Sequence, residues 1–586
     1  MEYAALVDIY EHLEATASTN EKTAVLADCF DAASESQLPI LATLIRGKLF
    51  PAWDSRELGV SSSLTREAIR KATGVDDDRV EEWWREYGDL GDAAALAVEH
   101  RTQQTLFSET LTVESVHETL TDLAEYIGEG SQSRRVDAVA KLLTSADPDE
   151  ARYVVRTVVG AMRLGIGEGT VRDAIAVAFL DGSDEAIAVV ERAHQLTNDF
   201  RVVAETARDE GVEGLRALDV ELFRPLKVML AQKAEGVGDA LTEVQGDADA
   251  ADETDATDIA DDTETGQNAV RCEYKYDGLR TQIHKRGDEV RIFTRRLEDV
   301  TEQFPEVVSA VRERITAERC ILEGETVGYS PETGRPVPFQ ELSQRIKREN
   351  RIEELVESVP VVTHLFDALY VDGESLLDES LRVRVGRLGD CVDTDPNDSD
   401  DSDVLRPATA VAPADESEAR EFYEDALSSG HEGIMVKNLD ATYQPGSRVG
   451  YMLKVKPLME PLDLVVVGAK WSEGRKSEFL GRLHLACRVE ESGELRDIGW
   501  LFSGLTDEQL AEITHRLEPL VTERDGREVR VRPEVVVEAE YEEIQQSTES
   551  ESGYALRFPR FAGFRDDLSF DEVDSLSKVE RLYAEQ

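Results

Sequence analysis

EYKYDGLR, residues 273–280, is the stretch from which the organisation of this 586-residue chain can be worked out. It places Lys275 between Glu273 and Asp277, directly before TQIHKRGDEVRIFTRR, a run typical of β-structure. Lysine is scarce, since only 15 of the 65 lysines and arginines are lysines. A K-x-D-G motif alone is equally compatible with a surface lysine beside a turn. Its meaning therefore depends on the segments that follow.

The downstream segments combine cations, acids and one aromatic residue in a fixed order. They are FTRR with Arg295, ILEGETVGY with Glu323 and Glu325, HLFDALYVDGE with Phe366, EGIMVK with Glu432 and Lys437, and SRVGYMLKVK with Arg448, Lys454 and Lys456. In order and spacing, they resemble the nucleotidyltransferase motifs of ATP-dependent DNA ligases, most closely those of the archaeal and eukaryotic replicative type. The resemblance covers nearly the whole chain: residues 150–174 are similar to the DNA-binding domain of that family, and residues 553–561 to its last motif.

Lys275 is the nucleophile expected from the residue types. A lysine amine attacks an α-phosphorus to give a phosphoramidate only when it is neutral, and its ordinary pKa is about 10.4. Nearby cations lower that pKa, and the resemblance implies Lys454, Lys456 and a bound Mg²⁺ as these cations. Alternation in LKVK puts both lysines on one face of a strand, where they also neutralise charge on the phosphates. The expected cofactors are ATP and Mg²⁺.

The resemblance also implies which side chains hold the nucleotide. Glu273 would lie beside adenine, Phe366 would stack on it, and Glu325 would hold the ribose or, together with Glu432, the metal. Without the resemblance, Phe366 in an apolar strand would be interpreted as core, and the pair Glu323 and Glu325 as a solvated strand face.

The basic residues of the site are implied in the same way, because guanidinium and ammonium groups suit phosphate oxygens and hydroxyls. The implied AMP and phosphate ligands are Arg280, Arg295, Lys437 and Arg448. In the last motif the chain departs from the family, which usually places a lysine after the final acid, whereas Leu568 follows Asp567 here. Arg560 or Arg565 is the expected substitute for the pyrophosphate contact.

Periodicity divides the chain into three predicted domains. Residues 1–220 predict a helical DNA-binding domain, beginning with Leu6, Ile9, Tyr10 and Leu13 at the spacing of one buried face. Residues 221–458 change to short β-type runs punctuated by Gly and Pro, which predicts an α+β nucleotidyltransferase (adenylation) domain. Residues 459–586 hold alternating, turn-bounded runs typical of a small β-barrel, for which the resemblance implies an OB-fold.

The chain is strongly acidic, with 122 Asp and Glu against 65 Lys and Arg and a formal charge of −57. Residues 247–264 contain nine acids in 18 positions and residues 390–403 contain seven in 14, so we predict both as mobile surface insertions. A generally acidic protein is the simple interpretation. We favour adaptation of a halophile to molar intracellular salt, where a Debye length of about 3 Å screens such self-repulsion.

Several classes of protein are excluded by composition. No apolar run approaches the roughly 20 residues needed to span a bilayer, and the first residues carry acids where a signal peptide carries basic residues. The cysteines form no CxxC pair, which argues against a disulfide framework or a zinc ribbon and favours buried thiols. They are Cys29, Cys272, Cys320, Cys391 and Cys487. We expect a cytoplasmic, nucleoid-associated monomer.

A glycine run in residues 163–170, RLGIGEGT, follows a helical stripe and lacks the spacing of a dinucleotide loop. We predict a turn between two helices, with Thr170 as N-cap and exposed amides that face a DNA phosphate. A tight turn without a DNA contact is the alternative. The expected DNA-binding residues are Arg163, Gly165, Gly167, Gly169 and Thr170.

QQTLF, residues 103–107, resembles the short Q-x-x-x-aromatic stretch with which archaeal relatives bind the sliding clamp. The expected clamp contacts are Gln103, Leu106 and Phe107, since polar neighbours on both sides favour an exposed loop. A connector whose Phe107 fills the local core is the alternative.

The expected function is ATP-dependent sealing of 3′-hydroxyl/5′-phosphate nicks in duplex DNA through a lysyl-AMP, in replication, repair and recombination. An RNA ligase or mRNA-capping enzyme shares the lysine motif, but neither accounts for about 220 helical residues. A non-catalytic DNA scaffold is a further alternative, against which the intact Lys275, Glu325, Lys454 and Lys456 argue.

Overall fold

The structure is a computed structural model that describes residues 1–102, 109–250, 269–346, 351–393, 404–457, 459–472 and 479–585. The chain divides into two compact units, Met1–Lys456 and Pro457–Gln586. Within the described ranges, no helix is both long and apolar enough to cross a membrane. All five cysteines are buried free thiols.

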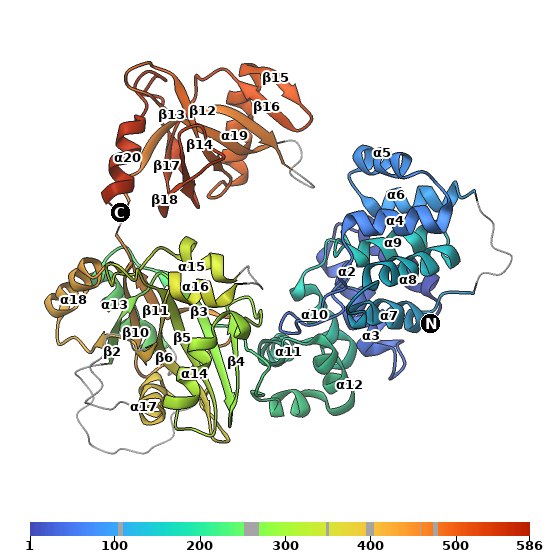
Figure 1. Ribbon diagram of the computed structural model, residues 1–586, viewed down its shortest axis with the longest axis horizontal. Helices are drawn as coiled ribbons and strands as arrows, with labels where there is room; N and C mark the ends of the chain where they lie inside the picture. Colours follow the sequence, from blue (N-terminus) through green and yellow to red (C-terminus); the bar gives the residue numbers. More distant parts are fainter. Residues whose placement is uncertain are drawn as a thin grey trace. The chain divides into compact units, whose positions relative to one another are not determined.

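The first part of the larger unit is a bundle of helices (Figure 1). Its helices are α1 (Tyr3–Ala15), α2 (Thr19–Asp31), α3 (Leu38–Leu44), α4 (Ser62–Thr73), α5 (Asp77–Tyr87), α6 (Leu90–Glu99), α7 (Val113–Asp122), α8 (Ser131–Ser145), α9 (Pro148–Val158), α10 (Glu168–Phe179), α11 (Asp184–Thr197) and α12 (Phe200–Ala217). The stripe predicted in the first helix is its buried face, since Leu6, Tyr10 and Leu13 are fully buried. The helical prediction for this region is confirmed.

Two sheets and their covering helices form the rest of this unit, as predicted for an α+β domain. The helices are α13 (Val237–Ala250), α14 (Pro305–Arg314), α15 (Phe339–Ile346), α16 (Ile352–Ser358), α17 (Leu381–Cys391) and α18 (Glu416–Ser428). The strands are β1 (Leu230–Lys233), β2 (Val270–Lys275), β3 (Leu279–Arg286), β4 (Glu289–Thr294), β5 (Arg319–Gly328), β6 (Val361–Val371), β7 (Glu374–Ser375), β8 (Leu405–Pro407), β9 (Ala410–Val411), β10 (Gly433–Asn438) and β11 (Arg448–Val455).

The order of these strands determines which motifs meet. One sheet has the order β1-β11-β10-β2-β9, and the other has the order β4-β3-β5-β6-β7 with β8 beside β6. β2 and β3 are consecutive in the chain but belong to different sheets, so the turn after Lys275 joins the two sheets. The motifs carried on β3, β5 and β6 are therefore close to those carried on β2, β10 and β11.

The C-terminal unit is the predicted small β-rich domain. Its strands are β12 (Leu462–Trp471), β13 (Leu480–Arg488), β14 (Leu495–Leu501), β15 (Val521–Asp525), β16 (Glu528–Val531), β17 (Val536–Glu540), β18 (Glu543–Gln546), β19 (Tyr554–Arg557) and β20 (Arg560–Phe564), and its helices are α19 (Asp507–Leu517) and α20 (Leu576–Glu585). β12 pairs with β13 along one edge and with β16 and β17 along the other, which curves the sheet around an apolar core.

The structure corrects two details. Thr170 is not the N-cap of α10, because the helix begins at Glu168 and the cap is Gly167, whose extended backbone needs no side-chain oxygen. Thr170 is instead buried in the first turn. The acidic segments begin inside helices, since residues 247–250 end α13 and residues 390–391 end α17. Residues 251–264 and 394–403 lie outside the described residues.

Candidate active site

Lys275 is the last residue of β2, and the structure brings Glu432 and Lys456 to its side chain. Lys275 pairs with Gly433 at the start of β10, and the backbone N–H of Glu432 donates to the backbone carbonyl of Lys275 at 2.9 Å. The Lys275 ammonium contacts Oε2 of Glu432, and Lys456 donates to Oε1 of the same carboxylate at 2.8 Å. Gly433 allows the start of β10 to lie close to the end of β11, because a Cβ on residue 433 would lie 2.2 Å from the carbonyl oxygen of Val455.

The surroundings of Lys275 favour a neutral amine. Burial, followed by the positive charge of Lys456, lowers the pKa of Lys275 to about 7, against the opposing effect of Glu325 and Asp277. Lys454, on β11, acts in the same direction as Lys456. Burial also raises the pKa of Glu325, which Lys275 partly offsets. The three lysines and Glu325 are therefore one electrostatic cluster.

Glu273 and Phe366 lie around a second buried cation, Lys437. Glu273 is 2% exposed and accepts hydrogen bonds from Lys437 at 2.5 Å and from Arg271 at 2.7 Å. Burial alone would raise the pKa of Glu273, but Lys437 and Arg271 hold it below its usual value. The Lys437 ammonium lies 4.5 Å from the centre of the Phe366 ring. Phe366 is only partly buried and packs beside Tyr276, Val327 and Ala408.

Arg280, on β3, is a second cation beside Phe366. Its guanidinium carbon is 5.4 Å from the ring centre. One amino group donates to the carbonyl of Met229 at 2.6 Å and the other to Glu323 at 2.7 Å. A small cavity of about 20 Å³ is lined by Arg280, Phe366, Lys437 and Tyr443 among others. Tyr443 was not identified from the sequence. The one sequence feature that could have pointed to it is its position in a Gly- and Pro-containing loop, five residues before Arg448.

Arg295 and Arg448 are exposed, and both belong to the surroundings of Arg280. Burial of part of the side chain, followed by the charges of Arg280 and Arg448, lowers the pKa of Arg295. Arg448 begins β11 and donates to the carbonyl of Ala231 at 2.7 Å. The structure thus groups the three arginines predicted as phosphate ligands.

The carboxylates fit a magnesium site shared with phosphates. No group of three or more His, Cys, Asp and Glu side chains able to hold a metal occurs among the described residues. Mg²⁺ in nucleotide enzymes commonly uses one or two carboxylates and completes its shell with phosphate oxygens and water. Glu325 and Glu432, both within the cluster around Lys275, supply that number.

Arg560 and Arg565 belong to the C-terminal unit. Arg560 is half exposed and lies 3.9 Å from Glu542. Arg565 is paired with Asp463 at 2.6 Å and with Asp567 at 2.8 Å. Leu568, where a lysine was expected, packs partly buried against an apolar cluster. Of the two arginines, Arg560 has the weaker ion pairing and the freer guanidinium.

The glycine run forms the predicted turn between α9 and α10. Arg163, Gly165 and Gly167 are exposed, and Gly169 is half buried in the first turn of α10. The ammonium of Lys22 stabilises the turn by donating hydrogen bonds to the carbonyls of Leu164 and Gly165 at 2.5 and 3.1 Å. The clamp motif with Gln103, Leu106 and Phe107 lies outside the described residues.

Comparison with known proteins gives matches along the whole chain. Three family profiles match in succession: "DNA ligase N terminus" at residues 2–176, "ATP dependent DNA ligase domain" at 228–456 and "ATP dependent DNA ligase C terminal region" at 476–568. A DNA ligase of Thermococcus fumicolans is 42% identical over 586 residues, covering 100% of this chain and 99% of that protein. A DNA ligase of Methanopyrus kandleri is also 42% identical, with the same coverage.

A solved structure described as Pmar-Lig_Pre shares the fold over most of the chain. It covers 96% of this chain and 99% of its own, with a TM-score of 0.55 and 16% sequence identity. The succession of a helical region, an α+β domain and a β-rich C-terminal domain is therefore confirmed along one chain.

Proposed function

The chain belongs to the ATP-dependent DNA ligase family, and we propose that it seals nicks between a 3′-hydroxyl and a 5′-phosphate through an AMP carried on Lys275. The observation that carries the role of Lys275 is its partly buried amine, which lies beside Glu432 and Lys456 and whose pKa is lowered to about 7. Close to neutral pH, a substantial fraction of such an amine is deprotonated and nucleophilic.

Three transfers complete the reaction. The Lys275 amine attacks the α-phosphorus of ATP, a P–N bond forms, the bond to pyrophosphate breaks, and the amine releases one proton. An oxygen of the 5′-phosphate at the nick then attacks the same phosphorus, the P–N bond breaks, and Lys275 regains a proton. Finally the 3′-hydroxyl attacks the 5′-phosphorus, loses its proton and releases AMP. Lys454 and Lys456 supply positive charge where phosphate charge accumulates in the first transfer.

We propose Phe366 as the surface on which adenine stacks and Glu273 as its neighbour at the edge of the base. The support is the partly buried Phe366 ring, which has the cations of Lys437 and Arg280 beside it. Arg280, Arg295 and Arg448 are proposed as ligands of AMP and phosphate because they form one group of guanidinium ions.

Magnesium is proposed as the metal cofactor, with Glu325 and Glu432 as its protein ligands. When bound, it would withdraw charge from the phosphate oxygens and make the α-phosphorus a better electrophile. The partly buried Glu325, whose pKa is raised by desolvation, is suited to receive a cation, because a positive charge offsets the cost of removing its carboxylate from water.

For DNA, we propose that the exposed turn of Arg163, Gly165, Gly167 and Gly169 contacts a phosphate. Arg560 is proposed to contact pyrophosphate, with Arg565 as the alternative. Three domains are proposed at residues 1–220, 221–458 and 459–586, and the successive family matches support this division.

The wider setting is proposed from the sequence. We propose that the ligase acts as a monomer in replication, repair and recombination, that residues 103–107 bind the sliding clamp, and that the protein works at molar salt. The support for the last point is the formal charge of −57.

The decisive experiment is incubation of the whole chain with α-labelled ATP and Mg²⁺, followed by denaturation. We expect label to stay on the protein and to pass to nicked DNA when DNA is added before denaturation. A DNA-binding scaffold without activity would retain no label. Label that moves only to nicked RNA would indicate an RNA ligase.

A further inference from the structure

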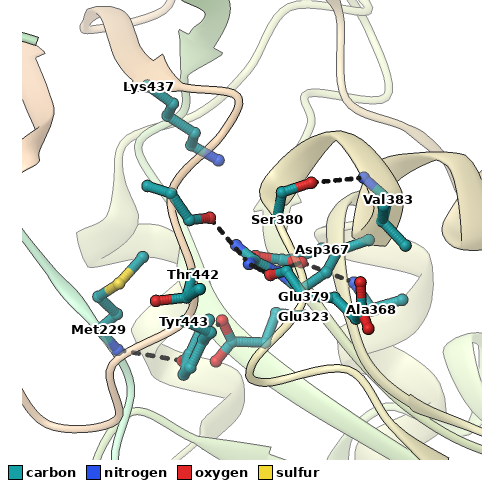
Figure 2. Close-up of polar contacts among 12 residues, drawn as sticks. Met229, Glu323, Asp367, Ala368, Glu379, Ser380, Val383, Lys437, Thr442 and Tyr443 are labelled. Atoms are coloured by element: carbon teal, nitrogen blue, oxygen red, sulfur yellow. Dashed lines mark hydrogen bonds and ion pairs between the residues drawn. The ribbon is translucent and has the colours of Figure 1, made fainter. Parts of the chain in front are cut away.

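Four hydrogen bonds close a ring around Arg280. Its guanidinium donates to the carbonyl of Met229 at 2.6 Å and to Oε2 of Glu323 at 2.7 Å. The hydroxyl of Tyr443 donates to the same Glu323 oxygen at 3.1 Å and accepts from the backbone N–H of Met229 at 3.1 Å. Figure 2 shows Tyr443 between Met229 and Glu323, joined to Met229 by a dashed line. The ring connects β3, β5, the loop after β10 and the residue before β1.

The members of the ring are removed from solvent. Glu323 is fully buried, and Met229 and Tyr443 are 5% and 4% exposed. Hydrogen bonds in such surroundings are electrostatically stronger than in water, and an unpaired buried partner is costly. Burial, followed by the charge of Glu323, raises the pKa of Tyr443, so its hydroxyl remains a donor.

The ring leaves one donor of the Arg280 guanidinium unpaired. Both amino groups of its guanidinium are used within the ring, whereas its buried Nε has no hydrogen-bond partner among the described residues. Buried donors normally find an acceptor. The guanidinium carbon also lies 5.4 Å from the centre of the Phe366 ring, so a nucleotide stacked on Phe366 would lie next to Arg280.

We infer that Tyr443 is a positioning residue for ATP, which acts through Glu323 and Met229 to hold Arg280 in its binding orientation. The inference rests on the proposed role of Arg280 as a nucleotide ligand. The Tyr443 hydroxyl holds both partners of Arg280, because it donates a hydrogen bond to the Glu323 carboxylate and accepts one from the backbone N–H of Met229. Its hydroxyl therefore contributes to nucleotide affinity without touching the reacting atoms.

The test replaces Tyr443 by Phe, which removes the hydroxyl and keeps the ring. We expect the KM for ATP in self-adenylylation to rise about fivefold, the effect of one hydrogen bond, while kcat stays within about twofold. Pre-adenylylated Tyr443→Phe protein should seal nicked DNA in a single turnover at close to the wild-type rate, because the AMP is then held by its covalent bond to Lys275 and its binding no longer depends on the affinity that Arg280 provides. A merely structural role would lower both activities together with the melting temperature.

Tyr451→Phe is the matched control. The Tyr451 hydroxyl donates to the carbonyl of Thr442 at 3.3 Å, next to Tyr443, and contacts the thioether sulfur of Met229 at 3.9 Å, but it makes none of the four hydrogen bonds of the ring. We expect a change in KM below about twofold for this variant, since it loses only a long neutral hydrogen bond to Thr442 and a weak contact to the Met229 sulfur, and the four hydrogen bonds of the ring remain.

A double-variant cycle then tests whether Tyr443 acts through Arg280. In an Arg280→Lys background, adding Tyr443→Phe should change the KM for ATP by less than about twofold, because the guanidinium group that Tyr443 positions is absent. Equal effects of Tyr443→Phe with and without Arg280 would overturn the inference, as would an unchanged KM in the single variant. If Tyr443→Phe fails to fold, Glu323→Gln, which keeps the volume, should show the same rise in KM and the same dependence on Arg280.

These outcomes are separate from failure of the proposed function. If wild-type protein takes no label from α-labelled ATP, the proposed function fails and no KM exists to compare. If wild-type protein is labelled normally and Tyr443→Phe has an unchanged KM, only the role of Tyr443 is refuted.

Discussion

Lys275 contacts the carboxylate of Glu432, although 157 residues separate them in the chain. The contact stabilises the ammonium form of Lys275, whereas attack on a phosphorus needs the neutral amine. Lys456 binds the other oxygen of Glu432 and so competes for its negative charge. The lysine is thus held between one group that keeps it protonated and another that favours loss of the proton. Two predictions follow from this balance.

Lys275→Arg should fold normally and form no enzyme-AMP, since a guanidinium does not lose its proton in proteins. The positive charge next to Glu432 is retained, so the melting temperature should change little. The measurement is retention of label from α-labelled ATP after denaturation. Normal nick sealing by this variant would refute the mechanism.

Self-adenylylation should depend on pH through Lys275. Because the reactive form is the neutral amine and its pKa is lowered to about 7, the rate should rise with pH up to about 7 and level off above it. Lys456→Gln removes a charge that lowers this pKa, so the midpoint should move to higher pH. Lys470→Gln, in the C-terminal unit and paired with Glu528, is the control and should leave the midpoint unchanged. A midpoint that stays near 7 in Lys456→Gln would contradict this account.

Sequence patterns were sufficient for the succession of helical, α+β and β-rich regions, because periodicity and motif spacing are local properties. They could not show that one Glu432 carboxylate serves both Lys275 and Lys456, since this contact depends on the register of β2, β10 and β11. Thr170 was misplaced because three glycines made the start of α10 ambiguous, and Gly167 capped the helix through its backbone.

The acidic surface predicts a response to salt. At low salt, a chain with a formal charge of −57 should be repelled by DNA phosphate and by its own carboxylates. Sealing rate and melting temperature should therefore both increase as KCl rises towards about 1 M, where the Debye length is about 3 Å. Full activity and undiminished melting temperature at about 50 mM KCl would contradict adaptation to high salt.

The clamp prediction depends on sequence, since residues 103–107 lie outside the described ranges. Leu106→Ala combined with Phe107→Ala should abolish binding to a sliding clamp and its stimulation of sealing, because apolar anchors dominate such contacts. Sealing without clamp and the melting temperature should stay nearly unchanged. A double variant that unfolds, or that binds clamp with normal affinity, would favour Phe107 as a core residue.

The glycine turn can be tested at Gly165, whose φ of +63° is unfavourable for other residues. A Cβ at this position would lie 2.7 Å from Nζ of Lys22, the group that supports the turn. Gly165→Ala should therefore combine backbone strain of about 1–2 kcal/mol with displacement of Lys22, and should weaken binding of nicked DNA about tenfold.

The matched control for Gly165→Ala is Gly128→Ala, which has a φ of +80° and open space around the added methyl group. Both variants carry a similar backbone strain, and Gly165→Ala also displaces Lys22, so its melting temperature should fall at least as far as that of Gly128→Ala. Self-adenylylation should be normal in both, because the turn is remote in sequence and role from Lys275. If the two variants weaken DNA binding equally, the loss reflects general destabilisation, and the turn is a structural connection without a DNA contact. A loss confined to Gly165→Ala would locate a phosphate contact at the exposed amides between α9 and α10.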